Sequence, residues 1–122
     1  MIVAGFGFRK GADCASLQSA LEQAAKGSVV TAFAAPEDKA QSPCLTDIAR
    51  ATGLPVLPVS APVLAATQTP TQSAHSLARR DTGSVAEAAA LAAAGPGARL
   101  LSSRCISHDR LATCAVAIRG PS

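Results

Sequence analysis

Five short apolar runs along the chain predict β-strands, at residues 2–8, 29–33, 56–59, 98–103 and 111–119. The first run is apolar throughout, which is typical of a strand buried on both faces. Pro55 and Pro58 place the third run near an edge of the sheet, because proline cannot donate a ladder hydrogen bond. A short polar segment, 104–110, joins the last two runs and predicts an antiparallel hairpin.

Three segments between these runs have the spacing of amphipathic helices. Each has a capping residue before it and a glycine after it: Asp13 and Gly27, Ser42 and Gly53, Ser84 and Gly95. Pro43 stands at the first position of the second helix, where proline is tolerated. Glu87 follows Ser84 by three residues and predicts a capping box.

Residues 65–83 are the least regular part of the sequence. Ser60 opens a short helical turn at 62–64, and we expect a mobile loop and a short helix over 65–83. This stretch holds His75 and the basic pair Arg79 and Arg80. Long connections in compact domains are usually functional or disordered.

Strands that alternate with helices predict an α/β fold: a three-layer α/β/α domain over residues 1–122. Its sheet should be mixed, mostly parallel and five-stranded, and should end in the antiparallel hairpin. In such sheets the ligand crevice lies beyond the carboxyl ends of the parallel strands. The loops expected there are 7–11, 34–42 and 60–83.

Composition narrows the class of protein. Of 122 residues 48% are hydrophobic, 28 are alanine, and Trp and Tyr are absent, so the core is built from small side chains. A net charge of +3 without aromatic platforms argues against nucleic-acid binding and suits a small polyanion better. No apolar run approaches the roughly 18 residues of a membrane span, and no signal peptide is recognised, so we expect a cytoplasmic protein with no membrane contact.

The four cysteines, Cys14, Cys44, Cys105 and Cys114, show no CxxC spacing. In this setting we interpret them as small buried hydrophobic residues. Cys105 and His108 alone make only two ligands of a zinc site. We therefore expect no metal and no cofactor.

The glycine-rich segment 5–11 is the first candidate site. A dinucleotide fingerprint would need a glycine where Lys10 stands and an acid after the second strand, and a P-loop would need G-K-[ST]; the segment has none of these. What remains is a glycine turn with Arg9 and Lys10 before a helix N-terminus. It is either an anion cradle or a tight turn with solvated charges.

Three other candidates carry chemistry. The cluster Glu37, Asp38 and Lys39 could supply a general acid or base, or could be a solvated group of charges on a loop. Glu87 could face the crevice, although its capping role already explains it. His75 is the remaining candidate, as a general base. The sequence shows no Ser-His-Asp or Cys-His arrangement.

Several segments together resemble the CobE family, whose domain is also the C-terminal part of CbiG. The opening GFGFRKG resembles the family's G-x-G-x-R-[KR]-G, and TGSVAEAAA at 82–90 is similar to its G-x-x-S-V-[AC]-E-x-x-A helix start. Further similarities lie at 39–45, 53–56, 60–61, 98–101, 104 and 113–117. The sequence departs from the pattern at Phe8, where many members have Cys, and at Ser42 and Cys44, which replace an acid and a glycine.

The resemblance implies a role in cobalamin (vitamin B12) biosynthesis, the binding or handing over of a polycarboxylate tetrapyrrole (precorrin) intermediate of the corrin ring. The alternative is a hydrolase that opens a lactone of the cobalt-precorrin-5A type and releases acetaldehyde, as the longer relatives do. A third hypothesis is a structural partner of another enzyme of the pathway.

Each hypothesis names residues. The residues expected to bind the ligand are Gly5, Gly7, Arg9, Lys10, Gly11, Lys39, Ser84 and Arg104. A hydrolase would draw its catalytic groups from Lys39, His75 and Glu87. A structural partner should show an exposed apolar patch away from the crevice.

Overall fold

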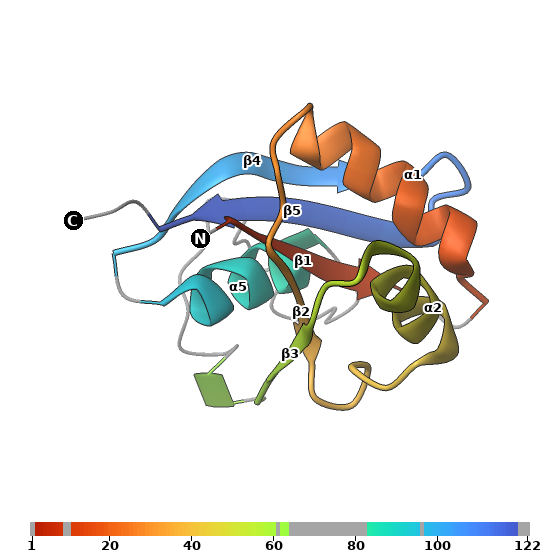
Figure 1. Ribbon diagram of the computed structural model, residues 1–122, viewed down its shortest axis with the longest axis horizontal. Helices are drawn as coiled ribbons and strands as arrows, with labels where there is room; N and C mark the ends of the chain where they lie inside the picture. The colour runs from red at the N-terminus through yellow and green to blue at the C-terminus, as the bar shows by residue number, and fades with distance from the viewer. Residues whose placement is uncertain (1, 9–10, 61, 64–82, 96, 120–122) are drawn as a thin grey trace.

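Strand β1 (Ile2–Phe8) lies at the centre of the sheet, with β2 on one side and β5 on the other (Figure 1). The computed structural model describes residues 2–8, 11–60, 62–63, 83–95 and 97–119. The central position explains the apolar sequence of β1, because a strand with neighbours on both sides and helices on both faces meets no water. The predicted bounds of this strand are confirmed.

Five strands form one sheet in the order β3-β2-β1-β5-β4. Their bounds are β2 (Ala32–Pro36), β3 (Val56–Val59), β4 (Arg99–Ile106) and β5 (Ala112–Ile118). β1 pairs in parallel with β2, and β2 with β3, whereas β5 is antiparallel to both β1 and β4. Four strands therefore point one way and β5 points the other, so the mixed sheet with a closing hairpin is confirmed.

Helices cover both faces of this sheet. On one face, α1 (Cys14–Ala25) and α2 (Pro43–Thr52) pack on Phe6, Phe33 and Val116. On the other, α5 (Gly83–Ala94) packs on Val3, Ala34 and Ala117. The expected three-layer α/β/α architecture is thus confirmed. Residues 62–63 are helical, as expected for the short turn there, while residues 64–82 lie outside the described part of the chain.

The core differs between the two faces. Towards α1 and α2, side chains are large, and the rings of Phe6 and Phe33 meet edge to face with centroids 5.4 Å apart. Towards α5, the buried cluster is mostly alanine: Val3, Ala32, Ala34, Val59, Ala89, Ala90, Ala94 and Ala117. Because alanine side chains are small, the alanine-rich face of α5 lies close to the sheet, and α5 approaches β1 closely.

The bounds of three predicted segments are wrong. β2 spans Ala32–Pro36 instead of 29–33, because parallel pairing with β1 starts at Val3 and Ala32 and pairing with β3 continues to Pro36. The hairpin turn is shorter than 104–110, since β4 continues to Ile106 and β5 begins at Ala112. α5 already includes Gly83, so Ser84 lies inside the helix and is not its N-cap. The expected capping box with Glu87 is therefore corrected.

Candidate functional site

The last residues of four strands meet at one side of the sheet, which we name the carboxyl edge. These residues are Phe8, Pro36, Val59 and Ile106. Strand order reverses at β1: β2 and β3 are added on one side with helices on one face, and β5 and β4 on the other side with α5 on the opposite face. Such a reversal point is where α/β sheets bind ligands. The end of β1, at Phe8, is therefore the place to look first.

Lys39 reaches this point from the turn after β2. Its backbone N–H donates to the Pro36 carbonyl (2.8 Å), which bends the chain back towards β1. Its Nζ donates to the carbonyl oxygen of Phe8 (3.1 Å) and lies 5.2 Å from the centroid of the Phe8 ring. An ammonium group has three N–H donors, so two remain for a ligand. Among the described residues, Lys39 thus places a cation at the end of the central strand.

The other charged residues predicted near Lys39 make no such contact with the end of β1 among the described residues. Glu37 and Asp38 are exposed on the same turn, as expected for solvated charges. Gly11 lies in the connection between β1 and α1 with φ of 101°, a conformation that favours glycine, and a β-carbon there would meet nothing within 4 Å. Arg9 and Lys10 lie outside the described residues.

Gly5 and Gly7 are placed inside β1 and not in the loop that follows it. Both are buried and face α5. A β-carbon on Gly5 would lie 2.2 Å from the Ala86 carbonyl oxygen, and one on Gly7 would lie 3.0 Å from Oγ1 of Thr113. Close packing of α5 on the strand accounts for Gly5, whereas the space at Gly7 is limited by Thr113 of the neighbouring strand β5.

The remaining predicted residues are scattered. Ser84 lies in the first turn of α5, at the carboxyl edge. Arg104 lies within β4 and not in the hairpin turn, because the strand is longer than its sequence suggests. Glu87 is fully buried on α5. His75 lies outside the described residues. Among the described residues, Lys39 is thus the predicted side chain that contacts the end of β1, at Phe8.

A hydrogen-bonded cluster beside this edge has no counterpart in the sequence analysis. Asp13 caps α1, with its Oδ1 accepting from the backbone N–H of Ser16 (2.9 Å). The Ser16 hydroxyl also contacts Oδ2 of Asp109, in the turn between β4 and β5. Hydrogen bonds from Ser107, Ser16 and the Leu111 backbone hold the pKa of the Asp109 carboxyl below its usual value. Residues 16 and 109 are 93 positions apart, so no local pattern could reveal this contact.

The cysteines agree in part with their interpretation as small hydrophobic residues. Cys44 and Cys114 are buried, and Cys14 and Cys105 are half-buried; all four are free thiols. Burial raises the pKa of Cys44, and raises that of Cys114 further. Within the described part of the chain, no three His, Cys, Asp or Glu side chains come together as metal ligands.

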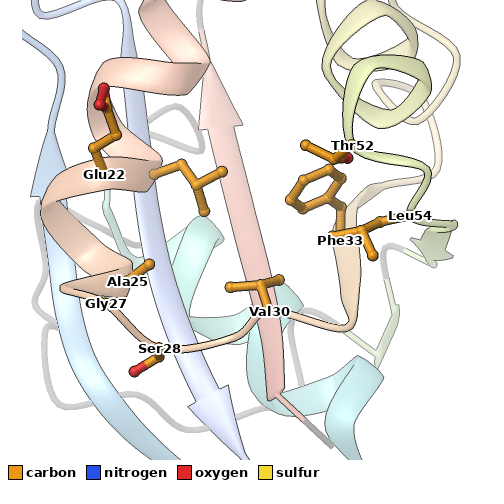
Figure 2. Close-up of a pocket in the computed structure, with 9 residues that line it drawn as sticks. Glu22, Ala25, Gly27, Ser28, Val30, Phe33, Thr52 and Leu54 are labelled. Carbon is orange, nitrogen blue, oxygen red and sulfur yellow. The ribbon is translucent and has the colours of Figure 1, made fainter.

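A cavity of about 530 Å³ lies on the α1 and α2 face, at the far end from the carboxyl edge (Figure 2). Leu21, Val30, Phe33 and Leu54 give it an apolar wall. Its one charged lining residue is Glu22, so its lining would repel a polycarboxylate. Size alone therefore does not make this cavity the site for an anionic ligand.

Comparisons with a family model and with solved structures match this chain to proteins of cobalamin biosynthesis. Residues 2–117 match the family model described as Cobalamin synthesis G C-terminus. The crystal structure of CobE, a protein from the cobalamin (vitamin B12) biosynthetic pathway, is 32% identical with a TM-score of 0.76, over 96% of this chain and 89% of that one. Cobalamin biosynthesis protein chiG from Agrobacterium tumefaciens is 34% identical with a TM-score of 0.77, over 99% and 100%.

A third solved structure shares the fold alone. It is a homologue of cobalamin biosynthesis protein G from Sulfolobus solfataricus, 20% identical with a TM-score of 0.70; the match covers 95% of this chain and 36% of that one. No protein of curated function matches the sequence. Among the described residues, no helix is both long and apolar enough to cross a lipid bilayer.

Proposed function

The chain belongs to the Cobalamin synthesis G C-terminus family, and from this premise we propose that this cobalamin biosynthesis protein binds a polycarboxylate tetrapyrrole intermediate at the carboxyl edge. The bound intermediate would then be handed to another enzyme of the pathway. Corrin precursors are flat apolar rings with acetate and propionate groups around the rim. A protein that recognises them needs cations for the rim and apolar contacts for the ring.

The position of Lys39 carries the proposal. Its ammonium group is held at the end of β1 by the Phe8 carbonyl oxygen and the Phe8 ring. Because these contacts fix the side chain before any ligand arrives, a carboxylate would bind it with a smaller loss of conformational entropy. Hydrogen bonds between an ammonium and a carboxylate are among the stronger ones in proteins. The switch point of the sheet supports the same location.

The aromatic content limits how a flat ring could be held. The chain has three Phe and no Tyr or Trp, and Phe6, Phe8 and Phe33 are all buried. No phenyl, phenol or indole ring is therefore exposed for stacking on a macrocycle. A bound tetrapyrrole would depend on its carboxylates and on aliphatic contacts, which makes the charge at Lys39 more important than in a site with stacking.

An absorbance titration with hydrogenobyrinic acid, a cobalt-free corrin polycarboxylate, tests the proposal. We expect a saturable spectral shift and co-elution with the protein on gel filtration. Lys39→Gln should weaken binding roughly tenfold or more, since a hydrogen bond to a charged group contributes about 1.5–3 kcal/mol. Lys26→Gln is the matched control: it removes the same charge from the C-cap of α1, at the end of the helix away from the carboxyl edge.

The outcomes separate the alternatives. Absence of a spectral shift and of co-elution would overturn the binding proposal. A Lys26→Gln variant as weak as Lys39→Gln would show that net charge and not this site governs binding. Acetaldehyde released from a cobalt-precorrin-5A lactone would favour the hydrolase hypothesis over simple binding, and it is measured in separate samples of the protein incubated with that lactone.

A further inference from the structure

The turn between β4 and β5, together with Ile106 at the end of β4, is bonded to α1 by three contacts, from Ser16 in its first turn to Gln23 in its last. Asp109 accepts from the Ser16 hydroxyl, the His108 backbone N–H donates to Oγ of Ser19 (3.2 Å), and Gln23 Nε2 donates to the Ile106 carbonyl oxygen (2.9 Å). The turn follows one strand of the sheet, whereas α1 follows another. These contacts therefore join two parts of the carboxyl edge that are far apart in the sequence.

The turn itself orients the Asp109 carboxylate. Its Oδ1 accepts from the Ser107 hydroxyl (2.6 Å) and from the Leu111 backbone N–H (3.1 Å). The other oxygen, Oδ2, is left for Ser16. The Ser107 hydroxyl in turn accepts from the Ala112 backbone N–H (3.1 Å), so the carboxylate is tied to the start of β5. Asp109 is held by its own turn and presents one oxygen to α1.

Ser16 transmits this position to the start of the helix. Its side chain is 2% exposed, and it is the third residue of α1, in a capping box with Asp13. Asp13 follows Gly11 by two residues, in the connection that begins after Phe8, where Lys39 is bonded. A shift of Ser16 would therefore move the helix cap at Asp13 and the segment from Gly11 to Asp13 that leads into it.

We propose that Asp109 is a positioning residue for the ligand site: through Ser16 it fixes the N-terminus of α1 and the segment from Gly11 to Asp13 at the carboxyl edge. The inference rests on the proposed function for its ligand, a corrin polycarboxylate. Asp109 does not touch the ligand in this arrangement. It acts through the hydrogen bond to Ser16.

Substitution of Asp109 removes both a negative charge and a hydrogen bond, and these two losses should change ligand affinity in opposite directions. Removal of a carboxylate near a site for a polyanion should strengthen binding through electrostatics alone. Loss of the bond to Ser16 should weaken binding, because the ligand must then order the start of α1 itself. Asp109→Asn separates the two, because the new Oδ1 can accept from Ser107 and Leu111 while the new Nδ2 can donate to the Ser16 oxygen. The Ser16 hydrogen then goes to Asp13 Oδ1, already 3.1 Å away.

The experiment compares Asp109→Ala, Asp109→Asn and Asp47→Ala in the hydrogenobyrinic acid titration. Asp47 is an exposed residue of α2, and its replacement makes the same change in charge. We expect Asp109→Ala to weaken binding roughly three- to tenfold, because the ligand must then order the start of α1. Asp109→Asn and Asp47→Ala should bind as tightly as wild type or more tightly. Equal affinity for the two alanine variants would overturn the inference.

A second measurement needs no ligand. Amide hydrogen exchange at Ser16 and Leu17 should quicken in Asp109→Ala and stay near the wild-type rate in Asp109→Asn. Unchanged exchange in Asp109→Ala would refute the positioning role even if the protein binds corrins. Failure of wild type to bind would refute the proposed function, while exchange still decides whether Asp109 fixes α1. If Asp109→Ala does not fold, Ser16→Ala removes the same bond from the helix side.

Discussion

Strand β1 and helix α5 meet at Gly5 and Ala86, where a β-carbon added to Gly5 would lie 2.2 Å from the Ala86 carbonyl oxygen. The same β-carbon would lie 2.6 Å from the Ala90 backbone nitrogen. Both atoms belong to the helix backbone, which cannot rotate away as a side chain can. The distance between helix and strand is thus set by the missing side chain at position 5.

Replacement of Gly5 by alanine should therefore force α5 away from the sheet. Overpacking of a tight core costs about 1–3 kcal/mol, and the contact with backbone puts Gly5→Ala at the upper end of this range or beyond. We expect the midpoint of thermal unfolding, followed by circular dichroism, to fall by roughly 5–15 °C.

Gly7→Ala is the matched control on the same strand. Its β-carbon would lie 3.0 Å from the Thr113 hydroxyl oxygen, a side-chain atom that can adjust, and 3.6 Å from Cβ of Val85, which is an ordinary van der Waals contact. This variant should lose less than half as much stability as Gly5→Ala. Equal losses, or a neutral Gly5→Ala, would contradict the explanation of Gly5 by helix packing.

The sequence predicts the elements that local patterns determine. β1 and β3 have the predicted bounds, and Asp13 and Gly53 cap their helices as expected. β2 was misplaced because Val29 and Val30 have high strand propensity, yet Val29 is 77% exposed and β2 begins only where pairing with β1 allows. At this position the pairing register with β1, and not the strand propensity of the two valines, determines where the strand begins.

The candidate site was predictable to a smaller extent. Its location follows from the order of strands and helices. The proximity of Lys39 to the end of β1, at Phe8, follows because β1 and β2 are parallel neighbours. The bond between Ser16 and Asp109 does not, because it depends on β5 lying next to β1 and α1 lying across them. Contacts between distant segments need the assembled sheet.

Asp109 should contribute to stability in a pH-dependent way. In the folded protein, hydrogen bonds lower the pKa of the Asp109 carboxyl below the usual 3.8. Its contribution to stability is therefore present above pH 3.8 and is lost as the pH falls through the pKa of the folded state. The gap in unfolding midpoint between wild type and Asp109→Ala should be constant from pH 5 to 7 and narrow below about pH 4. Other carboxyls titrate in both proteins and cancel. A gap that widens in acid would contradict the assignment.

The four thiols should differ in reactivity. Cys114 is fully buried, and desolvation raises its pKa well above the usual 9.0, with a smaller effect of Cys105. Thiolate is the reactive form, so Cys114 should be alkylated by iodoacetamide only after unfolding. Cys14 and Cys105 are half-buried and should react first in the native protein. Peptide mass spectrometry measures the order, and early labelling of Cys114 would show that β5 opens in the native state.

Lys26 offers a way to stabilise the protein without touching the carboxyl edge. It ends α1 with φ of 46° and ψ of 46°, the left-handed conformation that costs a residue with a β-carbon about 1–2 kcal/mol. Glycine adopts this conformation freely but loses more entropy on folding, so Lys26→Gly should gain about 0.5–1 kcal/mol and raise the unfolding midpoint by roughly 2–5 °C. Gly53→Ala makes the opposite change at the end of α2, where φ is 75°, and should lower the midpoint by a similar amount. A lower midpoint for Lys26→Gly would mean that the Lys26 side chain stabilises α1 by more than its backbone strain costs.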